Sequence, residues 1–165
     1  MMQKIPDKHL QDLPIGRILS IDYGEKRIGI ALSDPLQSLS TGLSTIQNKN
    51  RQLIVDEICR MADDNQVVAI VVGFPLNMNG RISKAALQVE ELANQLREKI
   101  DLPLFLWDER WTTKSAHSLM HQLGKSPSRH KDKVDQIASA ILLQSFLDRL
   151  ERVRKENNAR VCKIK

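Results

Sequence analysis

Short apolar runs alternate along the chain with segments in which apolar residues recur at helical spacing. Two β-type runs cover residues 17–22 and 27–33, and Tyr23-Gly-Glu-Lys26 separates them. The glycine of that spacer permits a tight turn, so we expect the two runs to pair as an antiparallel hairpin. A third, shorter run at residues 43–47 follows a loop and predicts a third strand before the first long helix.

The middle of the chain has the pattern of a sheet covered by helices. Apolar residues at helical spacing predict helices over residues 51–64 and 82–99. Between them, residues 67–72 are apolar at almost every position, as in a strand that is buried on both faces of a parallel sheet. Residues 103–107 predict a fifth strand.

Two helices are predicted after the fifth strand. Thr112 or Thr113 is expected to cap the first, which Gly124 ends. A polar, basic loop at residues 125–131 leads to a last helix over residues 133–150. The order β-β-β-α-β-α-β-α-α predicts an α/β fold with a mixed sheet and helices on its faces, where ligands bind at the carboxyl ends of the parallel strands.

Length and composition restrict the organisation to one core. With 165 residues, of which 41% are apolar, the chain fits a single domain over residues 1–150, followed by a basic, flexible tail over 151–165. The first 17 residues are polar and lack the apolar stretch of a secretory signal. Cys59 and Cys162 form no paired spacing, so we expect a reduced, cytoplasmic protein.

The positive charge is unevenly distributed. The net charge of the chain is +5, yet residues 149–165 hold seven Lys or Arg against two acids. The rest of the chain is therefore balanced overall, although residues 110–133 form a second basic strip. A basic strip of this kind is suited to phosphate groups, whereas the basic tail is more typical of a solvated chain end.

Three acidic residues fall at points that a parallel sheet brings together. Asp22 ends the first strand, Glu109 follows the fifth, and Asp135 opens the last helix. An oxygen-only cluster of this kind suits Mg²⁺ or Mn²⁺. Each acid also has an ordinary explanation by itself: Asp22 as a turn former before Gly24, Glu109 as a surface partner of Arg110, and Asp135 as a helix N-terminal acid facing the dipole.

The helical position of Asp135 separates it from a rival acid. Asp135 and Leu142 lie about 20° apart around a helix, so the carboxylate is expected to point inward beside Ala138 and Ser139. An unpaired charge there would be costly, and metal coordination is one remedy. Asp132 lies about 60° away from that line and ranks second as the third ligand.

At these residues the chain resembles the YqgF (RuvX) family of Holliday-junction resolvases and ribosomal-RNA-processing nucleases, within the ribonuclease-H-like superfamily. The resemblance rests on four motifs in order: Asp22-Tyr-Gly-Glu-Lys-Arg27-Ile-Gly-Ile-Ala31, Val72-Gly73-Phe-Pro75, Trp107-Asp-Glu109-Arg110, and Lys133-Val-Asp135. Trp111 departs from the leucine common in the family at that position, but no acid is affected.

The resemblance implies a ribonuclease-H-like fold whose five-stranded sheet has antiparallel strands 1–3 extended by parallel strands 4–5. It also implies that Asp22, Glu109 and Asp135 are catalytic and bind two Mg²⁺ or Mn²⁺ ions. Basic residues near these acids are candidates for nucleic-acid binding, and they are Lys26, Arg27, Arg110, Arg129 and Lys131.

The expected function is that of a divalent-metal-dependent endonuclease that processes the 5′ end of pre-16S rRNA in ribosome biogenesis. One alternative is a Holliday junction resolvase acting on branched DNA, which would require a homodimer rather than a monomer. Another is a non-catalytic RNA-binding ribosome assembly factor with the same fold. No membrane partner is expected, because the longest apolar block, at residues 67–76, is too short to span a bilayer.

Overall fold

Five strands form one mixed sheet in the computed structural model, which describes residues 7–76, 82–109 and 131–162. The strands are β1 (Arg17–Tyr23), β2 (Arg27–Ser33), β3 (Ser40–Gln47), β4 (Val67–Phe74) and β5 (Leu104–Asp108). Their order in the sheet is β3-β2-β1-β4-β5. β1 pairs antiparallel with β2 and parallel with β4, β2 pairs antiparallel with β3, and β4 pairs parallel with β5. The predicted fold class is confirmed.

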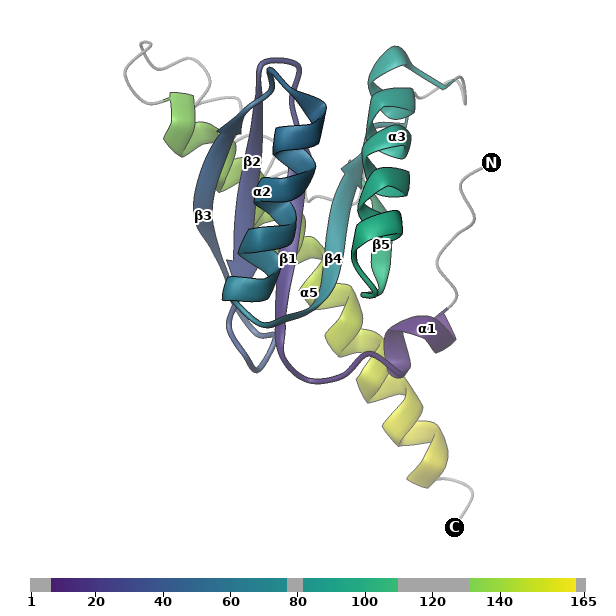
Figure 1. Cartoon of the computed structure of the whole chain (residues 1–165). Coiled ribbons are helices and arrows are strands. Elements are labelled where there is room, and N and C mark those ends of the chain that lie inside the picture. The colour runs from purple at the N-terminus through teal and green to yellow at the C-terminus, as the bar shows by residue number, and fades with distance from the viewer. Residues whose placement is uncertain (1–6, 77–81, 110–130, 163–165) are drawn as a thin grey trace.

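Helices cover both faces of this sheet. They are α1 (Asp7–Gln11), α2 (Arg51–Asp64), α3 (Lys84–Lys99) and α5 (Lys131–Cys162). Figure 1 shows α2 and α3 side by side on one face, while α5 crosses the other face diagonally and meets α1 beyond the sheet. The helix expected from Thr112 or Thr113 lies outside the described residues.

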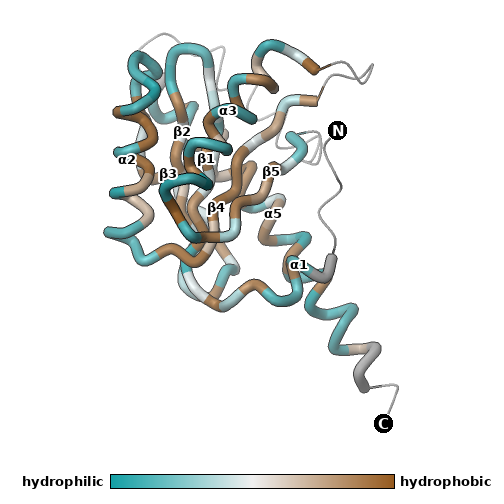
Figure 2. The backbone as a smooth tube through the Cα atoms, turned by 45° about the vertical axis from the view of Figure 1, so that its right-hand side comes forward, coloured by the Kyte–Doolittle hydropathy of each residue, from teal (hydrophilic) through white to brown (hydrophobic). Residues whose placement is uncertain are grey.

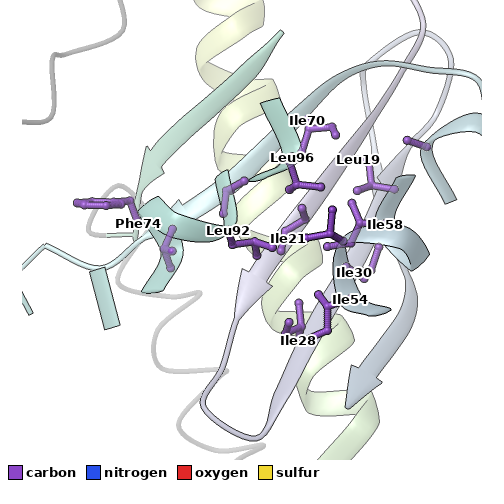
Figure 3. Packing of buried hydrophobic residues seen from close by; sticks show 14 of the residues in the cluster. Leu19, Ile21, Ile28, Ile30, Ile54, Ile58, Ile70, Phe74, Leu92 and Leu96 are labelled. Carbon is purple, nitrogen blue, oxygen red and sulfur yellow. The ribbon is translucent and has the colours of Figure 1, made fainter. Parts of the chain in front are cut away.

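The face under α2 and α3 carries the larger apolar core. Alternate residues of β1 and β2 point into it, and its members include Leu19, Ile21, Ile28 and Ile30, all fully buried. Figure 3 shows these side chains meeting Ile54 and Ile58 of α2 and Leu92 and Leu96 of α3. Side-chain oxygens of Asn50 and Ser83 accept backbone N–H groups of the first turns, which starts α2 and α3 at these residues.

Among the described residues, the opposite face of the sheet is covered mainly by α5, with the α1 region at its end. Residues of the other parity point to it, so Ile18, Ala69 and Val71 pack with Leu143 and Phe146 of the helix. The indole ring of Trp107 meets the edge of the Phe146 ring at 5.2 Å, and its Nε1 donates to Ser145. This second core fixes the position of α5 on the sheet. The position of the helix in turn sets the position of the side chains at its start, Asp135 among them.

The end of α5 was predicted too early. The helix continues to Cys162, twelve residues past the expected end at Leu150. Val153 is buried against the α1 region, and the Arg154 guanidinium donates to Leu13 O and to Gln37 Oε1, each at 2.8 Å. Residues 151–162 are therefore a helical extension rather than a flexible tail, and Figure 2 shows that the coloured part of this extension is largely hydrophilic. None of the helices in the described ranges has the length and hydropathy that crossing a membrane requires.

Candidate active site at the carboxyl edge of the sheet

Asp22 and Glu109 lie on the α5 face of the sheet, at the carboxyl ends of their strands. In β1, Ile18 packs against α5 and Ser20 contacts Ser139 of that helix, so Asp22 has the same parity. In β5, Phe105 and Trp107 pack on the α5 face, and Glu109 follows them at the same alternation. The parallel pairing of β1 with β4 and of β4 with β5 brings both acids to one edge.

Two glycines beside Asp22 make room for the other acids. Gly29 lies opposite Asp22 on β2, and Gly73 follows Val72, the β4 partner of Ile21. A Cβ at Gly29 would lie 2.2 Å from the backbone oxygen of Asp135, so α5 crosses β2 at backbone distance there.

The second glycine accommodates the glutamate. A Cβ at Gly73 would lie 3.0 Å from Glu109 Oε1 and 3.0 Å from Leu142 Cδ2. Asp22 is consequently flanked by Asp135 over one neighbouring strand and by the Glu109 carboxylate over the other. Figure 1 shows this edge at the upper end of the sheet, where the β1–β2 turn and the start of α5 lie.

A hydroxyl pair sets the position of α5 along β1. Ser20 Oγ donates to Ser139 O at 2.9 Å, and the two hydroxyl oxygens lie 2.8 Å apart. Asp22 lies two residues further along the strand, about 7 Å away, and Asp135 lies one helical turn earlier, about 6 Å away. Both displacements run in the same direction, so the serine contact brings the two aspartates to the same level.

The electrostatics of this edge are those of a crowded anionic site. The pKa of Asp22 is raised to about 7. Burial is the largest cause, and the charges of Glu109 and Asp135 add to it. Burial also raises the pKa of Glu109, with Asp108 adding to the effect. A bound cation would remove both penalties, and the donors are all carboxylate oxygens, so the residues present fit Mg²⁺ or Mn²⁺.

Asp135 was expected to be an unpaired charge pointing inward, but its carboxylate is paired and only partly buried. Its Oδ2 accepts from Arg27 Nε at 2.5 Å, and the side chain is 26% exposed. Asp132 is 69% exposed, and its Oδ1 lies 3.7 Å from the same Arg27 atom. The cost of placing the Asp135 charge here is thus offset by its ion pair with Arg27.

The three acids share an edge but do not form a ready ligand group. Within the described ranges, no three His, Cys, Asp or Glu side chains lie close enough together to hold one metal ion. Among the basic candidates, Lys26 is exposed in the β1–β2 turn and Arg27 faces Asp135. Arg110 and Arg129 lie outside the described residues, and Lys131 is placed only by its backbone, as the first residue of α5.

Ser20 and Gly29 shape the site and were not singled out from the sequence, whereas Gly73 was part of a family motif and Ser139 was expected beside Asp135. Ser20, Ser139, Gly29 and Gly73 carry no chemistry of their own, and they act by fixing how closely α5 and Glu109 approach the sheet. The sequence did contain one indication that a helix approaches the sheet closely. Small residues take alternate positions on one face of β1, β2 and α5, which is typical of a close helix–sheet contact.

Solved structures of two Holliday junction resolvases share this fold. Thermus thermophilus RuvC, in complex with a Holliday junction substrate, has a TM-score of 0.53 over 82% of this chain and 96% of that chain, at 15% identity. The yeast mitochondrial Holliday junction resolvase also has a TM-score of 0.53, over 90% of this chain and 87% of that chain, at 15% identity. The fold is therefore the ribonuclease-H-like fold of the resolvases.

Sequence relatives give the family. A protein of Roseiflexus sp. is 43% identical over 133 residues, which is 81% of this chain and 94% of its own. A protein of Syntrophomonas wolfei is 40% identical over 132 residues, which is 80% of this chain and 94% of its own. Both carry the name "Putative pre-16S rRNA nuclease". The RuvX family model, described as Holliday junction resolvase, matches residues 16–149. The chain belongs to the RuvX family, and its class is that of a hydrolytic nuclease.

Proposed function

We propose that this protein is a divalent-metal-dependent endonuclease that trims the 5′ end of precursor 16S rRNA in the cytoplasm. The observation that carries the proposal is the position of Asp22, a carboxyl with a pKa raised to about 7 beside two further acids. Such a perturbed acid at the carboxyl edge of an α/β sheet is a functional-site signal. The names of the relatives support RNA as the substrate.

Asp22, Glu109 and Asp135 are the residues that would hold Mg²⁺ or Mn²⁺. When bound, a metal pair supplies an activated water and stabilises the leaving oxygen of an in-line phosphodiester displacement. The chain itself provides the fixed geometry. The Ser20–Ser139 contact and the two glycine approaches hold strand β1, helix α5 and Glu109 at one edge, so the backbone positions of the acids are set before a metal binds.

Basic residues around the acids would bind the substrate backbone. Lys26 is exposed beside Asp22, and Arg27 opens β2 on the same face. Arg110, Arg129 and Lys131 flank the other two acids in the sequence and complete the proposed phosphate contacts. Recognition would then depend on phosphates and shape, because only 4% of the residues are aromatic and stacking surfaces are scarce.

The test is a cleavage assay on labelled precursor 16S rRNA and on four-way DNA junctions, with Mg²⁺ or Mn²⁺. Asp22→Asn, Glu109→Gln and Asp135→Asn should each reduce cleavage at least about a hundredfold, since each removes a ligand charge that the reaction requires. Asp148→Asn is the matched control, because it removes an exposed acid of α5 far from this edge. Cleavage that persists in all three acid variants would end the proposal.

Branched DNA is the second candidate substrate, because the family model is described as Holliday junction resolvase. Symmetric cutting of a four-way junction needs two active sites, so this activity would be accompanied by a homodimer in solution, whereas a monomer suffices for trimming RNA. The mass of the protein in solution, measured beside the same assay, separates the two. Tight RNA binding without any cleavage would instead indicate a non-catalytic assembly factor.

A further inference from the structure

The first residue of β2 is joined to the first turn of α5 by a sheltered ion pair. Arg27 Nε lies 2.5 Å from Asp135 Oδ2, and the two side chains are 25% and 26% exposed. The Lys155–Glu151 pair on the far part of α5 is different, because its side chains are 72% and 63% exposed. The attraction within a pair that has reduced solvent access is screened less by salt and water than the attraction within a surface pair.

The backbone holds this pair in place from both sides. Arg27 has the same parity as Gly29 on β2, and therefore points to the α5 face. The α5 backbone is seated at Gly29 through Asp135 O, and Thr45 Oγ1 donates to Asp132 O at 3.1 Å. Neither the strand nor the helix turn can move far, so the backbone keeps the guanidinium and the carboxylate within reach of one another.

The ion pair competes with any cation at the acidic edge. A carboxylate oxygen that accepts the Arg27 N–H has part of its charge neutralised and one lone pair occupied. Asp22 is affected differently, because burial and the charges of Glu109 and Asp135 all raise its pKa. Arg27 therefore neutralises part of the charge of Asp135, the carboxylate that a cation at this edge would also use.

We propose that Arg27 is a positioning residue that holds the Asp135 carboxylate in the metal-free protein and gives it up to a divalent ion. This inference rests on the proposed function, because it takes Asp135 as a metal ligand. It accounts for an observation above: the three acids share an edge without forming a three-ligand group within the described residues. A divalent ion bound at this edge would take the place of Arg27 at Asp135, with Asp135 and Asp22 as the residues that would hold it.

The exchange leaves Arg27 with a second task. A guanidinium released from Asp135 remains anchored at the start of β2, on the face that carries Asp22. Its fork of donors matches the oxygens of a phosphate group. Metal binding and substrate binding are then coupled, since the ion frees the donor that the phosphate uses, and such coupling is reciprocal.

The experiment measures Mn²⁺ affinity by calorimetry in the absence of nucleic acid, so that its result does not depend on activity. Arg27→Gln should bind Mn²⁺ about tenfold more tightly than the wild type, which corresponds to the loss of about 1.4 kcal/mol of competition. Lys26→Gln is the matched control, because it removes one positive charge at the neighbouring, exposed position. It should change the affinity less than about threefold, as a solvated charge acts only through screened attraction.

A double-mutant cycle decides between this exchange and a general charge effect. Asp135→Asn alone should weaken Mn²⁺ binding, and Arg27→Gln should give no further gain in that background, because the competing contact is already absent. An equal gain from Arg27→Gln with and without Asp135 would overturn the inference. So would equal gains from Arg27→Gln and Lys26→Gln.

The outcomes also separate this inference from the proposed function. If Asp135→Asn weakens Mn²⁺ binding while Arg27→Gln leaves it unchanged, the metal site stands and the exchange is refuted. If Asp135→Asn binds Mn²⁺ as the wild type does, both fail. Arg27→Lys provides a second variant should Arg27→Gln not fold: it keeps the charge but loses the Nε donor, and its affinity should fall between those of the wild type and Arg27→Gln.

Discussion

Ser20 of β1 and Ser139 of α5 bind one another through buried hydroxyls, although 119 residues separate them in the chain. The contact is the point where the last helix is registered against the central strand. A shift of one residue on either element would carry Asp22 or Asp135 to another face, because side-chain direction changes with every residue. The acidic edge therefore depends on two residues that take no part in the proposed chemistry.

Replacement of Asp22 by asparagine should stabilise the metal-free protein in a pH-dependent way. The folded pKa of Asp22 is raised from 3.8 to about 7. Between these values the unfolded chain releases the proton and the folded chain keeps it, so wild-type stability falls as the pH rises. The advantage of Asp22→Asn should grow from near zero at pH 4 to at most about 4 kcal/mol at pH 8.

Thermal or urea unfolding in the presence of a chelator measures this difference. Asp148→Asn, which removes an exposed acid, serves as the control and should show no such trend. A wild-type protein whose stability relative to Asp22→Asn is flat between pH 4 and pH 8 would show that the site carries no burial penalty.

The two glycines beside Asp22 should respond differently to alanine. At Gly29 the added methyl meets the α5 backbone, which cannot yield, so Gly29→Ala should cost about 2–3 kcal/mol of folding free energy. At Gly73 it meets the ends of the Glu109 and Leu142 side chains, which can turn aside. Gly73→Ala should therefore cost less than about 1.5 kcal/mol but displace Glu109 and reduce cleavage strongly.

Urea unfolding and the cleavage assay, run on the same preparations, give both quantities. The prediction fails if Gly73→Ala loses as much stability as Gly29→Ala, or if its cleavage rate matches that of the wild type.

The extension of α5 beyond residue 150 should contribute to stability through Arg154. Its guanidinium satisfies the Leu13 carbonyl and the side chain of Gln37, which is 5% exposed. Arg154→Ala leaves these acceptors without that donor and should cost about 1–3 kcal/mol. Arg152→Ala is the matched control, since Arg152 is exposed and contacts only its own helix at Asp148 O among the described residues. Equal unfolding midpoints for the two variants would contradict the prediction.

Nucleic-acid binding should weaken steeply with salt. The proposed contacts are mainly to phosphates, and each neutralised phosphate releases counterions when the complex forms. Loss of Lys26 by Lys26→Gln should weaken binding to all sequences alike and reduce the slope of log affinity against log salt by about one. Filter binding or fluorescence anisotropy with catalytically inactive Asp22→Asn protein measures the affinity. Six phosphate contacts should weaken binding roughly a thousandfold between 50 and 200 mM salt, and an affinity that stays constant over this range would refute the prediction.

The local patterns predicted the elements because each element depends on residues close in sequence. The hairpin turn at Gly24 and the fully apolar run of β4 need no distant partner to be recognised. The common edge of Asp22, Glu109 and Asp135 followed from strand direction and from the family motifs.

Contacts between distant residues explain what the sequence did not show. The pairing of Arg27 with Asp135 spans 108 residues, and nothing near either residue indicates it. The length of α5 depends on Val153 and Arg154 meeting the α1 region, which is likewise a tertiary contact. Val153 is the next apolar residue at helical spacing after Leu150, and mostly polar residues follow it, so the pattern did not indicate a helix as long as the one observed.

The position of α5 at the end of the chain affects how the protein is made. Residues 17–108 can form the whole sheet as they leave the ribosome, but one of its faces lacks the helix that covers most of it among the described residues until α5 follows. A nascent chain stalled before Asp135 would expose that apolar face and would lack one of the three acids, so it would attract chaperones and leave nearby RNA uncut. Catalytic competence would then arise only when synthesis is nearly finished.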